Sequence, residues 1–191
     1  MTAPYPGFPT DLQPDSDITI QGGIWTDLAT APWESNGNGR GAVDPQGSVP
    51  GAYGVIVLSN VARVVVRDVT IAQSRPFGVH LSNVRDFVVE NVRFEDHRRD
   101  GVHINGPAAY GIVRNISGVT GDDMVALNAW DWQYSTMTFG TIESVLVEDV
   151  TGRSLATATS GPVPDGSAEI RLLPGHKRFE DGSRLACDLQ D

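Results

Sequence analysis

The feature of this sequence that most constrains its fold is a repeat of 23 residues. Aliphatic residues recur at this spacing in two columns that share one register. One column holds Ile56, Val79, Val102 and Val125, and the other holds Leu58, Leu81, Ile104 and Leu127. The two-residue alternation of a β-strand turns the residues between the columns to the opposite face. These are Val57, His80, His103 and Ala126. The spacing therefore predicts one β-strand that recurs in every repeat.

Each repeat also holds a second run that is typical of a strand. Valine-rich runs begin near residues 64, 87, 110 and 145, and a similar three-residue phrase closes each one. The phrases are Arg67-Asp68-Val69, Glu90-Asn91-Val92, Arg114-Asn115-Ile116 and Glu148-Asp149-Val150. The third phrase comes one residue late, which predicts a one-residue slip in register. Because one repeat of short β segments cannot bury its apolar face alone, the repeats are expected to stack.

The predicted fold is all-β, a right-handed parallel β-helix with coils of about 23 residues. A leucine-rich repeat has a similar period, but its leucine and asparagine spacing is absent and no segment shows sustained helical periodicity. An antiparallel sandwich explains short strands but does not predict columns that hold register over three steps. The β-helix explains both observations.

We expect residues 1–191 to form a single domain. A proline-rich lead-in covers residues 1–16, and an alternating strand over 17–25 ends near a glycine pair. Residues 26–52 read as a long loop, and residues 153–191 as a loop followed by terminal strands. No cap is evident at the C-terminal end of the predicted stack. Either further coils of a longer protein or a partner subunit in a homo-oligomer is expected to cover that open edge.

Composition limits the partners. The formal net charge of −10 argues against nucleic acid and against an anionic membrane surface, since both call for clustered Lys and Arg. No apolar run approaches the ~18 residues of a membrane span. The one cysteine, Cys187, excludes an internal disulfide. No secretion signal pattern opens the chain, which leaves a cytoplasmic protein or one whose signal has been removed.

Three aspartates are the candidate catalytic residues. Asp100 and Asp123 are one repeat apart, so their backbones are expected about 4.8 Å from each other on neighbouring coils, with Asp122 beside them. Crowded like charges raise the pKa of at least one carboxyl, which leaves one acid and one base. Glycoside hydrolysis needs that division. Asp-Gly pairs are also common in turns, but turn geometry does not require two adjacent carboxylates above a third.

Polar residues near these aspartates are candidates for binding substrate. His103 lies three residues beyond Asp100 and could orient substrate or tune a carboxylate, and His80 shares its column. The simplest alternative for both is a solvated pair on the sheet face, and His97 in the preceding turn is expected to be exposed. We add Asn105 and Arg99 to the candidate binding residues. No metal and no cofactor are expected, since no ligand set with recognisable spacing emerges.

Two tryptophans follow the last aspartate pair. Trp130 and Trp132 share one parity on either side of a charged residue, outside the aliphatic columns. Core packing is the usual explanation of tryptophan. Their placement also fits a platform for sugar rings, so we include them among the candidate carbohydrate-binding residues.

These motifs resemble those of a known family. Asp100-Gly101-Val102-His103 followed by Gly121-Asp122-Asp123 is similar to the paired Asn-Thr-Asp-Gly and Gly-Asp-Asp signatures of the glycoside hydrolase family 28 polygalacturonases. Gly22-Gly23-Ile24-Trp25 resembles an early coil of that family. The similarity covers roughly residues 17–152, and Gly-Asp-Asp is its most specific part.

The resemblance implies hydrolysis with inversion and without a metal. By its pattern Asp122 would protonate the leaving oxygen, while Asp100 and Asp123 would activate the attacking water. Arg98-Arg99 stand where the family has Asn-Thr, and the family's Gly-His-Gly and Arg-Xaa-Lys motifs are absent. Because the latter motif grips a uronate carboxylate, an acidic protein without it is expected to act on a glycan other than polygalacturonate.

Two other classes of function stay open. A different β-helix enzyme, such as a polysaccharide lyase or an epimerase, would predict a cation or a metal near Asp100. A non-catalytic β-helix that binds carbohydrate or builds an oligomer would share the fold without acid and base carboxyls. The hydrolase is the prediction that the three aspartates favour.

Overall fold

The computed structural model describes residues 13–27, 54–129, 138, 140–154, 170–172 and 177–178, and the structural statements below concern these residues. They form nine strands of one sheet in which every pairing is parallel. These ranges contain no helix, and therefore none that could cross a membrane. The predicted all-β class, with a parallel sheet, is confirmed.

The strands follow the predicted segments closely. Their bounds are β1 (Asp15–Gln21), β2 (Ile24–Thr26), β3 (Gly54–Ser74), β4 (Phe77–His97), β5 (Val102–Thr120), β6 (Val125–Asn128), β7 (Ile142–Ser154), β8 (Ile170–Leu172) and β9 (Lys177–Arg178). The strand predicted over 17–25 appears as β1 and β2 on either side of the glycine pair, although β1 already begins within the predicted lead-in. Residues 28–53, most of the predicted long loop, lie outside the described part of the chain.

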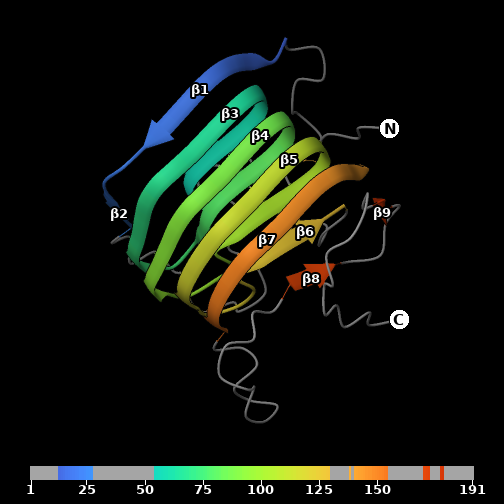
Figure 1. Cartoon of the computed structure of the whole chain (residues 1–191). Coiled ribbons are helices and arrows are strands. Elements are labelled where there is room, and N and C mark those ends of the chain that lie inside the picture. Colours follow the sequence, from blue (N-terminus) through green and yellow to red (C-terminus); the bar gives the residue numbers. More distant parts are fainter. Residues whose placement is uncertain are drawn as a thin grey trace, which may run out of the picture.

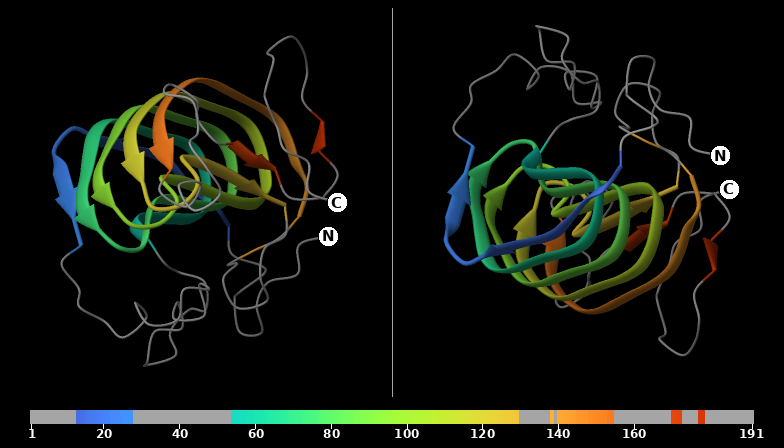
Figure 2. Two further views of the ribbon diagram at one scale, coloured as in Figure 1. Left: turned by 90° about the horizontal axis from the view of Figure 1, so that it is seen from below. Right: turned by 90° about the horizontal axis from the view of Figure 1, so that it is seen from above.

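The register bears out the repeating columns. Ile56 pairs with Val79 and Ser74 with His97, in each case one full repeat further along the chain. The predicted slip occurs after Ser82, since Val84 pairs with Ala108 rather than with its neighbour Pro107. Strands β3, β4, β5 and β7 lie side by side (Figure 1), and the ribbons of β3, β4 and β5 curve round a common interior (Figure 2).

Besides the one-residue slip, five pairings have offsets longer than the repeat, and two of them serve as examples. β1 pairs with β3 at twice the repeat, as Ile18 with Val64. β5 pairs with β7 at more than one repeat but less than two, as Gly111 with Val145. In both places the extra chain is accommodated between strands, and the pairing resumes in parallel.

The aliphatic columns form the core. Val79, Leu81, Val102 and Ile104 are fully buried, as are Phe87 and Phe94. Burying one such side chain stabilises a fold by roughly 1.5–3 kcal/mol relative to exposure. The strands that lead away from the aspartates are therefore anchored firmly on their inner face.

One corner of the stack is made by a column of asparagine and aspartate, which we call the Asx corner. Its members have left-handed backbones: Asp68 (φ 57°), Asn91 (φ 54°), Asn115 (φ 51°) and Asp149 (φ 51°). Asn and Asp tolerate this conformation better than other residues with a side chain. The Asn91 Nδ2 donates to Asp68 Oδ1 at 2.8 Å, and the Asn115 Nδ2 donates to Asn91 Oδ1 at 2.7 Å. This corner explains why similar phrases close the second strand of each repeat.

Candidate functional site

The candidate site lies where the chain turns into the strands that carry the first aliphatic columns. Two of these turns stack through their backbones: the Gly101 N–H donates to the Asp123 carbonyl at 2.8 Å, and the Gly78 N–H donates to the Asp100 carbonyl at 3.0 Å. Asp100 and Asp123 therefore occupy one position on successive turns, with Phe77 at that position on the turn before. The predicted stacking of these two aspartates is confirmed, and we call this position the aspartate turn.

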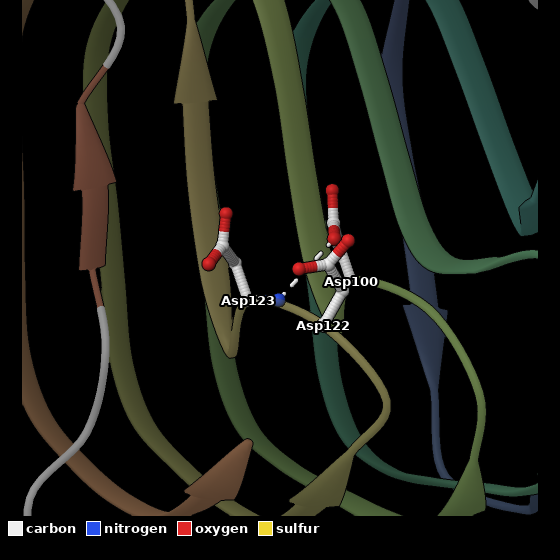
Figure 3. Close-up of side chains that lie close together, drawn as sticks. All are labelled: Asp100, Asp122 and Asp123. Carbon is white, nitrogen blue, oxygen red and sulfur yellow. Dashed lines mark hydrogen bonds between the residues drawn. The ribbon is translucent and has the colours of Figure 1, made fainter. Parts of the chain in front are cut away.

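The three predicted aspartates come together. One carboxylate oxygen from each of Asp100, Asp122 and Asp123 can be chosen so that all lie within 4.8 Å of one another. Asp100 and Asp123 are only 6% and 5% exposed, whereas Asp122 is partly exposed. Figure 3 shows the three side chains grouped at the start of β5 and β6. Carboxylate oxygens at this spacing can hold one water between them, and oxygens of this kind are also ligands for hard cations.

Glycine sets the distance between the two turns. A Cβ on Gly121 would lie 2.1 Å from the carbonyl oxygen of Arg98, and a Cβ on Gly101 would lie 2.6 Å from that of Met124. No side chain fits at such distances. These two glycines beside the aspartates therefore let neighbouring backbones touch, which brings the carboxylates together.

Both oxygens of Asp100 accept hydrogen bonds. The Nδ1 of His103 lies 2.6 Å from Asp100 Oδ2, and the backbone N–H of Asp123 donates to Asp100 Oδ1 at 3.3 Å. The second contact is drawn as a dashed line in Figure 3. A carboxylate that accepts at both oxygens is suited to act as a base or to hold water, rather than to donate a proton.

His97 is buried, so the expectation that it is exposed is wrong. Its Nε2 lies 2.7 Å from the Asp100 carbonyl oxygen, and its Nδ1 lies 2.5 Å from Ser74 Oγ. A carbonyl only accepts, so Nε2 carries the hydrogen and the Ser74 hydroxyl donates to Nδ1. Burial lowers the pKa of His97 to about 4, which keeps the ring neutral. The spacing could have pointed to this contact, because Ser74 and His97 are one repeat apart.

His80, His103 and Asn105 are also fully buried, so the histidines are not the solvated pair that the simplest alternative described. The Nε2 of His80 lies 2.8 Å from Asn105 Oδ1. The Nδ2 atoms of Asn105 and Asn128 each lie 3.3 Å from the Nε2 of His103. These side chains contact one another behind the aspartates. Sequence reasoning missed Asn128, although it lies one repeat beyond Asn105.

A phenylalanine that the sequence reasoning missed completes this cluster. The ring of Phe77 stacks on the ring of His103 with centroids 3.8 Å apart and planes 10° apart. Phe77 is buried and precedes Asp100 by one repeat. Its place in the aspartate column is the signal that could have found it.

Arg99 stands beside the aspartates. Its Nη1 lies 3.9 Å from Asp122 Oδ2, and its guanidinium carbon lies 5.5 Å from the centroid of the Phe77 ring. Arg98 instead pairs with Asp96 at 2.8 Å, where both side chains are exposed. Of the two arginines before Asp100, Arg99 is therefore the one placed to meet a ligand of the aspartates.

Two predicted binding residues, Trp130 and Trp132, lie outside the described residues, and their role stays a prediction. Comparisons with protein-family models, with curated proteins and with solved structures found no match.

Proposed function

We propose that the chain is a right-handed parallel β-helix, built from coils of the length of the sequence repeat, and that it hydrolyses glycosidic bonds with its three grouped aspartates. The uniformly parallel pairing and the register of one repeat between β3 and β4 support the fold. The observation that carries the function is the approach of three carboxylates within 4.8 Å. Keeping like charges together costs stability unless one of them holds a proton, and an acid beside a base is the requirement of glycoside hydrolysis.

The surroundings of the aspartates divide their roles. Asp122 is the least buried of the three, so a leaving glycosidic oxygen can reach it, and we assign it the general acid. Asp100 accepts hydrogen bonds at both oxygens, so we assign it, with Asp123, to the attacking water. The water oxygen bonds to the anomeric carbon as the bond from that carbon to the glycosidic oxygen breaks, and the water proton passes to Asp100 and Asp123. Asp122 gives its proton to the departing oxygen.

The stereochemical course follows from the separation of acid and base. Inverting enzymes place the two carboxyls about 6.5–9.5 Å apart, and retaining enzymes about 5–5.5 Å apart. The resemblance to family 28 favours inversion, and attack by a water held by Asp100 and Asp123 is a single displacement, which also inverts the anomeric carbon. NMR of the anomer released first decides between the two courses.

Charge narrows the substrate. The protein carries a formal net charge of −10, and three aspartates line the site. A polyanionic glycan is repelled by such a field, and Arg99 is the cation that lies beside the aspartates. We therefore propose a neutral or weakly acidic polysaccharide or oligosaccharide.

The test is release of reducing sugar from a panel of neutral and acidic glycans by wild-type protein and by Asp122→Asn. We expect activity on at least one neutral glycan and a loss of about 10²- to 10⁴-fold in the variant, the usual contribution of a general acid. Asp96→Asn is the matched control, because Asp96 is exposed and paired with Arg98. Activity that survives in Asp122→Asn would contradict the assignment, and an inert wild type would contradict the hydrolase.

A second candidate, a polysaccharide lyase or epimerase, is favoured by the cation at Arg99 and by oxygens close enough to hold a divalent ion. A lyase leaves an unsaturated product that absorbs ultraviolet light, so the same reactions followed by absorbance separate lyase from hydrolase. Added calcium and a chelator test the need for an ion. If the protein is a non-catalytic module, wild type and Asp122→Asn should bind a glycan equally well and neither protein should cleave it.

A further inference from the structure

A buried chain of side chains leads from His80 to the carboxylate of Asp100. It runs through the amide of Asn105 and the ring of His103, with successive contacts of 2.8, 3.3 and 2.6 Å. All three residues behind Asp100 are at most 1% exposed. Buried polar groups are costly unless they are hydrogen-bonded, so a connected chain of this kind holds its members in one arrangement.

The direction of each hydrogen bond follows from the Asn105 amide. Its Oδ1 faces His80 Nε2, so that nitrogen carries the hydrogen and donates. Its Nδ2 faces His103 Nε2 and donates to it, which leaves Nε2 without a hydrogen. The Asn128 Nδ2 approaches the same nitrogen. The hydrogen of a neutral His103 ring is therefore on Nδ1, where it points at Asp100 Oδ2.

Aromatic packing holds the His103 ring in this orientation. Phe77 stacks on one face, with centroids 3.8 Å apart. The ring of His80 meets it edge-on, with centroids 5.0 Å apart and planes at 89°. A ring enclosed in this way cannot turn its Nδ1 away from Asp100 without displacing both neighbours.

We propose that His103 is a positioning residue, which holds the carboxylate of Asp100 toward Asp123 while His80, Asn105 and Asn128 keep His103 in its Nδ1–H form. This inference rests on the proposed function for its catalytic meaning. Of the two roles predicted for His103, orienting substrate or tuning a carboxylate, the proposal takes the second, and it gives His80 and Asn105 a supporting role in place of contact with substrate. Their burial places them behind the carboxylate rather than in front of it.

The first test needs no substrate, and it leaves His103, the residue that is measured, unchanged. The chain contains four histidines, so long-range proton–nitrogen NMR spectra of ¹⁵N-labelled full chain can be assigned residue by residue. At neutral pH we expect His103 to show a protonated Nδ1 and an unprotonated Nε2. In Asp100→Asn the nitrogen signals of His103 should shift more than those of His80. A protonated Nε2 on His103, or signals that ignore Asp100→Asn, would overturn the proposal.

The second test uses the glycan identified by the activity panel. His103→Asn keeps an N–H donor near the position of Nδ1, whereas His103→Leu removes it. We expect His103→Leu to lower kcat about 10- to 100-fold, as losing an outer partner of a metal-bound ligand does, with KM nearly unchanged and with His103→Asn recovering most of the rate. A raised KM at unchanged kcat, or equal losses in the two variants, would overturn the positioning role.

The two tests separate this inference from the proposed function. If no glycan is hydrolysed, the proposed function fails, while the spectra still decide whether His103 holds Asp100. If His103→Leu does not fold, the spectra of wild type and Asp100→Asn decide in its place.

Discussion

The Asx corner and the aspartate turn both recur along the stack. The corner keeps similar residues from one repeat to the next, whereas the aspartate turn does not. At the Asx corner, Asp68, Asn91 and Asn115 keep similar side chains and join them by hydrogen bonds from strand to strand. At the aspartate turn the residue changes along the stack. The successive residues there are Gly54, Phe77, Asp100 and Asp123. The residue type is retained where the backbone conformation requires it, and it changes where the backbone makes no such requirement.

Charge sharpens this comparison. Beside the Asx corner, the paired column Arg67, Glu90, Arg114 and Glu148 alternates in sign, and Arg114 Nε donates to Glu90 at 2.9 Å. At the aspartate turn two carboxylates of like sign stack with little exposure. Opposite charges across strands stabilise a sheet and like charges destabilise it. The column of Asp100 and Asp123 lacks this stabilisation, and it is the column that we assign to catalysis.

The largest effect on stability is expected when the pH is lowered enough to protonate His97, which contacts the backbone of the aspartate turn. His97 is neutral in the folded state because burial lowers its pKa to about 4, while the unfolded chain titrates near 6.5. Between these values the unfolded state binds the extra proton, so the free energy of unfolding falls as pH drops from 6.5 to 4. The loss from this residue is about 3 kcal/mol.

Denaturant unfolding at a series of pH values checks this expectation. His97→Gln carries no titrating ring, so its stability should fall less steeply over the same interval, although it starts lower than wild type. The carboxylates titrate in both proteins, so their contribution cancels when the pH dependence of stability of one protein is subtracted from that of the other. Parallel curves for the two proteins would contradict the assignment.

A smaller loss is expected at the Asx corner. Asn91→Val places a β-branched residue at a φ of 54° and removes the ladder bonds, which together should cost about 2 kcal/mol. Asn91→Gly accepts the backbone and loses only the hydrogen bonds, so it should cost less. Chemical denaturation of the three proteins gives the order, and a Val variant as stable as the Gly variant would show that backbone conformation does not explain this column.

The smallest effect has the opposite sign. Asp123→Asn removes one charge from the crowded aspartates, so the free energy of unfolding should rise by about 1 kcal/mol, while the proposed hydrolysis should be lost. The same denaturation series and the reducing-sugar assay measure both. A variant that is less stable than wild type would mean that this carboxylate serves the fold, and the contrast between the two columns would then disappear.

Much of the fold could be predicted because the same strand pattern recurs in each repeat of the sequence. Two aliphatic columns with one spacing indicated the strands and their register, and the late phrase Arg114-Asn115-Ile116 indicated the slip. The same spacing brought Asp100 above Asp123. These features depend on the chain's own periodicity, which a sequence displays directly.

The surroundings of the site could not be predicted in the same way. Alternation places His80 and His103 on the outer face of their strands but does not say what covers that face, and both are buried. The spacing pairs His97 with Ser74, but because both residues end their strands it does not say that their side chains turn inward. Phe77 contacts His103 although the two do not occupy the same position in successive repeats, so the spacing does not pair them.

The unequal offsets of the sheet have a consequence for how such a chain can change. Between β2 and β3 and between β6 and β7 the chain is longer than the repeat requires, and the additional residues precede Gly54 and follow Asn128 in the sequence. Along the Asx corner the paired runs continue without an inserted residue from Arg67 to Val69 and at the matching positions of β4, β5 and β7. The chain can therefore change in length between strands while the Asx corner keeps its register. We expect insertions or deletions confined to the connections before Gly54 and after Asn128 to leave the pairing of β3, β4, β5 and β7 intact.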